Sequence, residues 1–251
     1  MAEPDSFMSH LIELRDRLLR CVLALLLVFI CLFPWARDLY ALLAQPMIAS
    51  MPAGGQLIAT EVTAPFFVPV KVTMMAAFVI ALPYLLYQIW AFVAPGLYAH
   101  ERKLVAPLII TSTFLFVCGM AFAYYLVFPV VFHFMVTVAP EGVAVMTDIG
   151  KYLDFVLSLF LAFGVTFEVP VAVVILVRMG LVSVKTLKEI RPYIIVGAFV
   201  VGAIFTPPDV ISQCMLAVPL WLLYELGIFL ARFTGKPAKS PWAADETPQA
   251  E

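Results

Sequence analysis

The chain has 251 residues, of which 64% are hydrophobic and 13% are charged, and its mean hydropathy is +1.04. An average soluble domain has roughly a quarter of its residues charged, so this composition excludes an ordinary water-soluble domain and indicates a polytopic membrane protein. The net charge of −2 identifies no partner, because the distribution of charge between loops carries that information.

The N-terminal part combines an amphipathic segment, one apolar run and a loop. HLIELRDRLLR, at residues 10–20, has leucines at helical spacing with charges between them and predicts an interfacial helix. The apolar run predicts a first span at 18–33, close to the minimum that crosses a hydrocarbon core of ~30 Å. No small-residue cleavage site follows, so no cleaved signal peptide is expected. After a short amphipathic stretch, prolines and glycines predict an ordered external loop up to residue 69.

Five further spans are predicted, at 70–93, 104–132, 152–178, 193–206 and 210–230. Pro192 and Pro207 leave the fifth span only about 21 Å of helix at the standard rise. The tight TPPD turn after it predicts that the last two helices form an antiparallel hairpin, and both are expected to be short. Residues 1–235 thus form a single membrane domain, and the tail at 236–251 is expected to be a disordered cytoplasmic segment.

The basic residues predict the orientation. With the N-terminus in the cytoplasm, 12 of the 15 lysines and arginines lie inside, and only Arg37, Lys71 and Lys151 lie outside. Cytoplasmic loops of membrane proteins are enriched in these residues. We therefore expect an all-α protein with six spans and with both termini in the cytoplasm.

The chain lacks G-x-x-x-x-G-K-[ST], H-E-x-x-H and G-x-S-x-G, so nucleotide hydrolysis, zinc proteolysis and elbow-type serine catalysis have no sequence support. An intramembrane enzyme would need a nucleophile and a base at depth, but His133 stands alone at the end of the third span. Four cysteines lie in apolar runs without C-x-x-C spacing and are interpreted as packing residues: Cys21, Cys31, Cys118 and Cys214. We expect no enzyme activity, no catalytic residue, no metal and no cofactor.

Glu168 is the strongest candidate for a functional residue within a span. An ionisable group at the centre of a membrane helix costs about 2.5 to 3.5 kcal/mol on insertion scales and is a functional hypothesis by default. Pro170 follows two residues later, cannot donate to the carbonyl of Thr166, and is expected to kink the helix. The alternative is a protonated glutamic acid that is hydrogen-bonded within the bundle.

Two further carboxylates lie on interfacial segments. Glu13 could simply pair with Arg17 at i, i+4, and Glu101 could stabilise the first turn of the helix that follows it. Together they suit a different function, because two carboxylates can bind two guanidinium groups in a bidentate geometry that lysine cannot reproduce. Such a site would distinguish an Arg-Arg pair from Lys-Lys.

At this point the motifs resemble those of the TatC family, the receptor subunits of the twin-arginine protein translocase of bacteria and plastids. The resemblance runs from about residue 7 to residue 233 and rests on five stretches: HLIELRDRL at 10–18, PFFVPVK at 65–71, WAFVAPGLYAHERK at 90–103, AFGVTFEVPVAV at 162–173, and RPY, VGAFVVGA and TPPDVISQ within 191–213.

The resemblance implies a cup-shaped receptor that binds the Arg-Arg motif in signal peptides of folded precursors. It implies that Glu13 and Glu101 recognise the arginines and that four residues support the loop: Phe92, Pro95, Leu97 and Arg102. It places Glu168 on the concave face. It further implies a functional role for Pro46 and partner docking at Thr206 and Gln213.

The implied partners are the single-span subunits TatA and TatB, membrane lipid and further receptor complexes, with no nucleic acid. The implied location is the bacterial cytoplasmic (inner) membrane, and export would be driven by the proton motive force. One alternative is a proton-coupled secondary transporter that uses Glu168. Such a transporter normally has paired sequence repeats, and the only similarity of that kind here is a short one between the residues that end at Pro69 and those that end at Pro170.

Overall fold

The computed structural model describes residues 4–50, 57–93, 102–137, 147–205 and 210–233. Nearly all of this chain is helical, and its elements follow in this order: α1 Pro4–Leu32, a 3-10 turn Phe33–Trp35, α2 Ala36–Ser50, β1 Leu57–Ile58, α3 Ala64–Val93, α5 Arg102–Phe122, a π-helical turn Ala123–Val127, α6 Phe128–Thr137, β2 Thr147–Asp148, α7 Ile149–Phe167, α8 Val169–Arg178, α9 Val184–Glu189, α10 Arg191–Phe205 and α11 Val210–Arg232.

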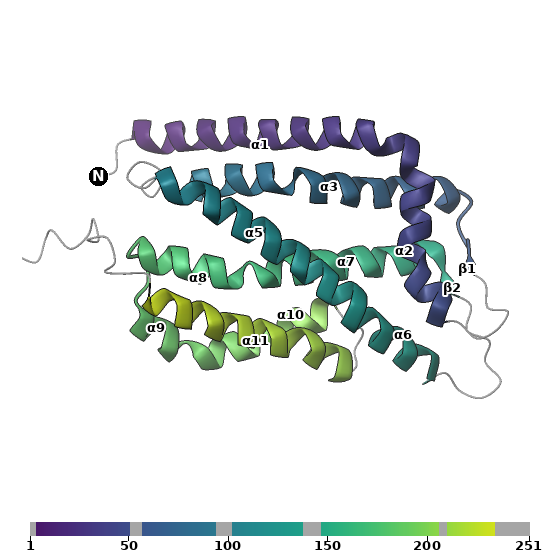
Figure 1. Ribbon diagram of the computed structural model, residues 1–251. Coiled ribbons are helices and arrows are strands. Elements are labelled where there is room, and N and C mark those ends of the chain that lie inside the picture. Colours follow the sequence, from purple (N-terminus) through teal and green to yellow (C-terminus); the bar gives the residue numbers. More distant parts are fainter. Residues whose placement is uncertain (1–3, 51–56, 94–101, 138–146, 206–209, 234–251) are drawn as a thin grey trace, which may run out of the picture.

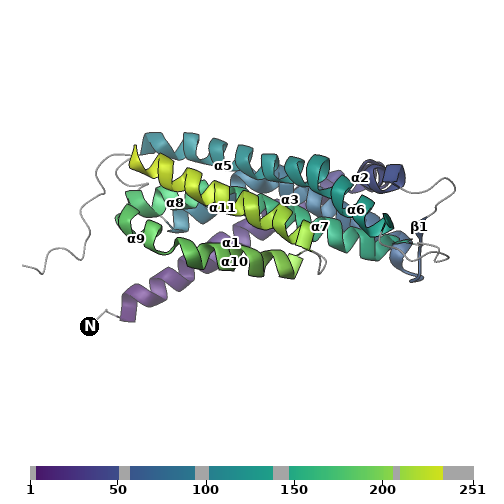
Figure 2. The ribbon, with the colours of Figure 1, turned by 90° about the horizontal axis from the view of Figure 1, so that it is seen from below.

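The long helices lie side by side in an elongated bundle (Figures 1 and 2). The start of α1, the end of α3, the start of α5 and the end of α11 lie at one end, which we call the N-terminal end (Figure 1). Helix α2 and both strands lie at the other, the α2 end (Figure 1). Helix α1 packs against α3, α5 against α7, and α11 against α8 and α10.

The described residues hold five apolar helical stretches long enough to cross a membrane, together with the shorter α10. This confirms the prediction of an all-α polytopic protein with a short fifth helix. The sixth helix is not short, however. Helix α11 has 23 residues, and it continues through Pro219. Helices α10 and α11 pack against each other as the predicted hairpin.

The helix of the second span begins earlier than predicted, at Ala64, and not at residue 70. Pro65 lies in the first turn, where its missing N–H has no helical partner to lose. Pro69 removes only one further ladder bond, and the Thr73 hydroxyl donates to the Pro69 carbonyl at 2.8 Å. Pro65 and Pro69, which suggested a loop, are therefore part of the first turns of a helix.

The third span contains a π-helical turn, which the sequence did not predict. The turn at Ala123–Val127 ends two residues before Pro129. Proline has no N–H for the carbonyl four residues before it, so a change of register at this point avoids an interrupted ladder. The turn is held in the main apolar core by its neighbours, since Val127, Phe128 and Val131 are fully buried.

Close backbone contact joins α5 to α7. A Cβ atom placed on Gly119 of α5 would lie 2.5 Å from the carbonyl oxygen of Phe163 in α7. A Cβ atom on Gly164 would meet the ring of Phe116. Small residues allow membrane helices to approach in this way, and here they hold α5 against the end of α7, directly before Glu168.

Candidate binding site

The first site lies at the N-terminal end and is built on α1. The Nε and Nη2 atoms of Arg17 both donate to Oε1 of Glu13, at 2.8 and 2.6 Å. The Nη1 atom of Arg17 donates to Oε1 of Gln88 at 3.1 Å, across to α3. The predicted i, i+4 pair is therefore present. Within the described chain, Oε2 of Glu13 accepts no hydrogen bond, and the side chain is 44% exposed.

The other predicted members of this site are only partly described. Phe92 is half-buried near the end of α3, and Arg102 begins α5. Pro95, Leu97 and Glu101 lie outside the described residues. The ends of the segment that carries them, Val93 and Arg102, lie at the same end of the bundle as the start of α1 (Figure 1). Joint action of Glu13 and Glu101 stays a prediction.

Glu168 lies at an interruption in the fourth span. Helix α7 ends at Phe167 and α8 begins at Val169, as Pro170 predicted. Both carboxyl oxygens of Glu168 are buried and have no hydrogen-bond partner among the described residues. The nearby Ser112 hydroxyl of α5 accepts from the indole N–H of Trp90 at 3.2 Å. Its own O–H is not used in that bond, so Ser112 can still donate to the Glu168 carboxyl, and the structural alternative for Glu168 stays open beside the functional one.

Gln213 joins the last two helices. Its Nε2 atom donates to the carbonyl of Phe199 in α10 at 2.8 Å, and its side chain packs where a Cβ atom on Gly202 would lie, 3.0 Å away. Thr206 lies outside the described residues. The side chain of Gln213 therefore positions α10 on α11, at the α2 end of both helices.

Pro46 lies inside α2, and its backbone has a visible consequence. Without an N–H at residue 46, the Leu42 carbonyl loses its usual partner in the helix. The Tyr124 hydroxyl, in the π-helical turn, donates to that carbonyl at 3.4 Å, and the buried Tyr152 hydroxyl donates to the Leu43 carbonyl at 3.1 Å. Two tyrosines from later spans thus hold α2 in place.

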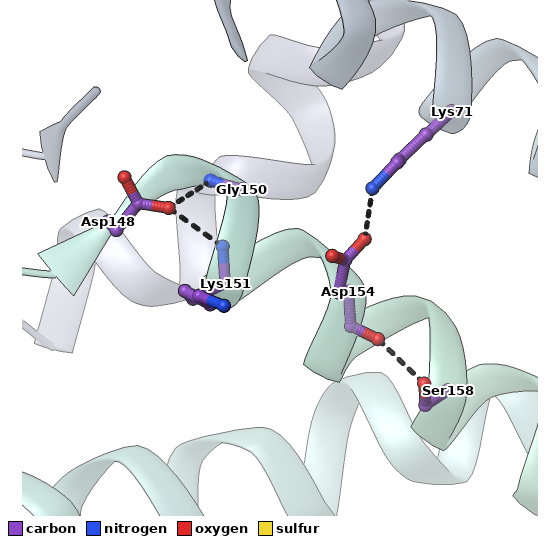
Figure 3. A network of polar contacts seen from close by, with 6 residues as sticks. All are labelled: Lys71, Asp148, Gly150, Lys151, Asp154 and Ser158. Atoms are coloured by element: carbon purple, nitrogen blue, oxygen red, sulfur yellow. Dashed lines mark hydrogen bonds and ion pairs between the residues drawn. The ribbon is translucent and has the colours of Figure 1, made fainter. Parts of the chain in front are cut away.

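Polar contacts at the α2 end join segments far apart in the chain (Figure 3). Strands β1 and β2 pair in parallel, Leu57 with Thr147 and Ile58 with Asp148. Oδ1 of Asp148 accepts from the backbone of Gly150 and Lys151, both at 2.9 Å, and so caps α7. Its Oδ2 accepts from the Thr60 hydroxyl and amide, at 2.6 and 2.8 Å. These hydrogen bonds, the Thr60 hydroxyl foremost, hold the pKa of Asp148 well below its usual range.

Sequence reasoning missed several polar partners that only the fold brings together. Gln88 is 4% exposed in the apolar second half of α3, and such an isolated amide was the available signal. Lys71 pairs with Asp154 at 2.6 Å (Figure 3), and Arg191 pairs with Glu225 at 2.5 Å. In the described part of the chain, no group of three or more His, Cys, Asp or Glu residues could hold a metal ion.

These features first define a class: a polytopic helical membrane protein with a half-exposed carboxylate at one end and a buried carboxyl at a break in its fourth span. The family model "Sec-independent protein translocase protein (TatC)" matches residues 9–219. The chain belongs to the TatC family.

Relatives from several bacteria support this assignment over nearly the whole chain. The TatC protein of Haemophilus influenzae is 55% identical over 231 residues, which are 92% of this chain and 90% of that protein. TatC of Escherichia coli K12 is 54% identical with the same coverage. TatC of Azotobacter chroococcum is 54% identical over 247 residues, 95% of this chain and 97% of that protein.

Solved structures agree. The crystal structure of a twin-arginine translocase receptor, TatC, superposes with a TM-score of 0.79 at 38% identity and covers 90% of this chain and 99% of that one. A second crystal structure of TatC, in DDM, gives a TM-score of 0.80. The protein is therefore a multi-pass inner-membrane component of the Sec-independent translocase, with a receptor function. The secondary-transporter alternative is not supported.

Proposed function

We propose that this receptor recognises the Arg-Arg motif in signal peptides of folded precursors with two carboxylates, Glu13 and Glu101. The observation that carries the proposal is the state of Glu13: one carboxylate oxygen is held by Arg17, while the other accepts no hydrogen bond within the described chain. An open carboxylate oxygen at the interface suits a guanidinium donor. Glu101 would supply the second carboxylate, with Phe92, Pro95, Leu97 and Arg102 shaping the loop that carries it.

The receptor would take part in a larger assembly in which the single-span TatA and TatB subunits dock at Thr206 and Gln213. The bond from Gln213 to the Phe199 carbonyl supports this role, because it sets the packing of the short α10 that a partner helix would complete. Further copies of the receptor complex would join, and the proton motive force would drive export. The N-terminal end would face the cytoplasm, where precursors arrive.

Glu168 would provide a polar side chain on the concave face of the receptor during transport. Its support is a carboxyl whose two oxygens are buried and have no hydrogen-bond partner among the described residues. Buried polar groups are rarely left in that state without a reason. Pro46 would act through α2, whose Leu42 carbonyl it releases to Tyr124.

The test is precursor binding to native membranes. A photo-crosslinking residue at position 100 is offered precursors whose signal peptides carry Arg-Arg or Lys-Lys, in wild type and in Glu13→Gln and Glu101→Gln variants. We expect a crosslink with Arg-Arg that falls at least tenfold with Lys-Lys and in either variant, the order of a lost charge-assisted pair. Glu189→Gln removes an exposed carboxylate at the same end and should change nothing. Equal crosslinks from both precursors would refute the proposal.

A further inference from the structure

Arg17 already occupies the carboxylate that the proposed function assigns to the ligand. Two of its three guanidinium nitrogens donate to Oε1 of Glu13, at 2.8 and 2.6 Å. The third donates at 3.1 Å to Gln88, whose side chain is buried in α3. Glu13 is therefore already bound by an arginine from its own chain, through one of its two carboxylate oxygens.

We propose that Arg17 competes with the signal peptide for Glu13 and so sets the affinity that a signal peptide needs in order to bind. Gln88 is then the acceptor to which Arg17 stays bound when it releases Glu13. This inference rests on the proposed role of Glu13. The ligand arginine first meets the open Oε2 of Glu13 and then replaces Arg17 at Oε1. Arg17 turns toward Gln88 and remains hydrogen-bonded.

Burial and exposure favour such an exchange. The Arg17 side chain is 22% exposed and that of Glu13 is 44% exposed, and pairs between partly exposed groups are weak and easily opened. Gln88 is 4% exposed and lies on a different helix, so its oxygen stays in place when Glu13 is taken by the ligand. Because Arg17 never loses all of its acceptors, its release leaves no buried guanidinium unsatisfied.

Competition of this kind would sharpen the choice of arginine over lysine. A guanidinium that binds one carboxylate through two nitrogens can be replaced by another planar fork at little loss. An ammonium group offers a compact point charge and cannot reproduce that geometry. The preference for arginine then has two sources. An arginine of the signal peptide binds Glu13 well, and a lysine fails to displace Arg17 from Glu13.

Two substitutions at Gln88 give opposite expectations. Gln88→Glu offers Arg17 a charged acceptor and draws it away from Glu13, so affinity for an Arg-Arg signal peptide should rise. Gln88→Leu removes the second acceptor, leaves Arg17 wholly on Glu13, and should lower that affinity. A purely structural role for Gln88 would lower the affinity in both variants.

The experiment measures equilibrium binding of labelled Arg-Arg and Lys-Lys signal peptides to native membranes that contain the full translocase. Arg17→Gln should bind Arg-Arg roughly two- to fivefold more tightly, the range spanned by exposed ion pairs, and should bind Lys-Lys with a larger gain. The ratio between the two peptides should therefore shrink. Thr73→Val, which removes another buried polar group of α3, serves as the matched control and should leave the ratio unchanged.

Three results separate the possible failures. If Glu13→Gln binds Arg-Arg as tightly as wild type does, the proposed function at Glu13 is wrong and this inference falls with it. If Glu13→Gln weakens binding but Arg17→Gln weakens it too, Arg17 supports Glu13 and the competitor role alone is refuted. Equal effects of Gln88→Glu and Gln88→Leu would likewise overturn the role of Gln88.

Discussion

At the scale of single residues, Asp148 shows how one carboxylate can hold two distant segments. One oxygen caps α7 and the other binds Thr60, which lies 88 residues earlier in the chain. Asparagine can still cap a helix with its one oxygen, but it cannot accept at the second position. Asp148→Asn therefore separates the helix cap from the link between segments.

We expect Asp148→Asn to lower the midpoint of thermal unfolding in detergent at pH 7 by about 2 °C or more. The pKa of Asp148 is lowered in the folded protein, so its contribution is complete above the usual pKa of about 4 and is lost as the pH falls through the lower folded value. The difference between variant and wild type should thus shrink on acidification below about pH 4. Asp38→Asn, at an exposed position in α2, is the control, and a difference that grows in acid would contradict the assignment.

At the scale of elements, the contact of α5 with α7 depends on glycine. Gly119→Ala would place a Cβ atom 2.5 Å from the Phe163 carbonyl, a distance that backbone atoms cannot yield without moving the helices apart. We expect a loss of stability of about 1 to 3 kcal/mol, the usual cost of overpacking. Gly197→Ala in α10 meets nothing within 4 Å and should be neutral or slightly stabilising. Unfolding of both variants in the same detergent makes the comparison, and equal midpoints would show that the helices can separate freely.

The elements that could be predicted are those with a local signal. The end of α7 at Glu168 follows from Pro170, and the length of α10 follows from Pro192 and the turn after it. Prolines were also the source of error, because their effect depends on their place in the helix. Those near the start of α3, which suggested a loop, are tolerated in the first turns of the helix.

The contacts of the candidate site likewise include some that a local sequence signal predicts and others that depend on the packing of distant helices. The Glu13–Arg17 pair is one helical turn apart and was predicted, whereas the bond from Arg17 to Gln88 joins residues 71 positions apart. Such a bond depends on how α1 packs on α3, and neither helix shows that register in its own periodicity. The pairing of β1 with β2, two residues on each side, is likewise a product of the surrounding helices and not of strand propensity.

At the scale of the whole molecule, the fold sorts the charges between two ends. Arg15 and Arg17 lie in the first half of α1 and Arg20 near its middle. A second group lies on α9 and on the ends of the neighbouring helices, at the N-terminal end: Arg178, Lys185, Lys188, Arg191 and Arg232. Arg37, Lys71 and Lys151 lie toward the α2 end. An excess of lysine and arginine marks the cytoplasmic side.

The last prediction therefore concerns orientation, and two exposed residues at opposite ends can test it. Val62, just before α3, is 98% exposed at the α2 end, and Lys185 is exposed in α9 at the N-terminal end. In a background without native cysteines, Val62→Cys should react with a membrane-impermeant maleimide in intact spheroplasts, and Lys185→Cys should react only after permeabilisation. Because the fold fixes both positions, one labelling pattern orients the whole bundle. The reverse pattern would place Glu13 outside the cytoplasm, away from arriving precursors, and would refute the orientation together with the proposed recognition of the Arg-Arg motif.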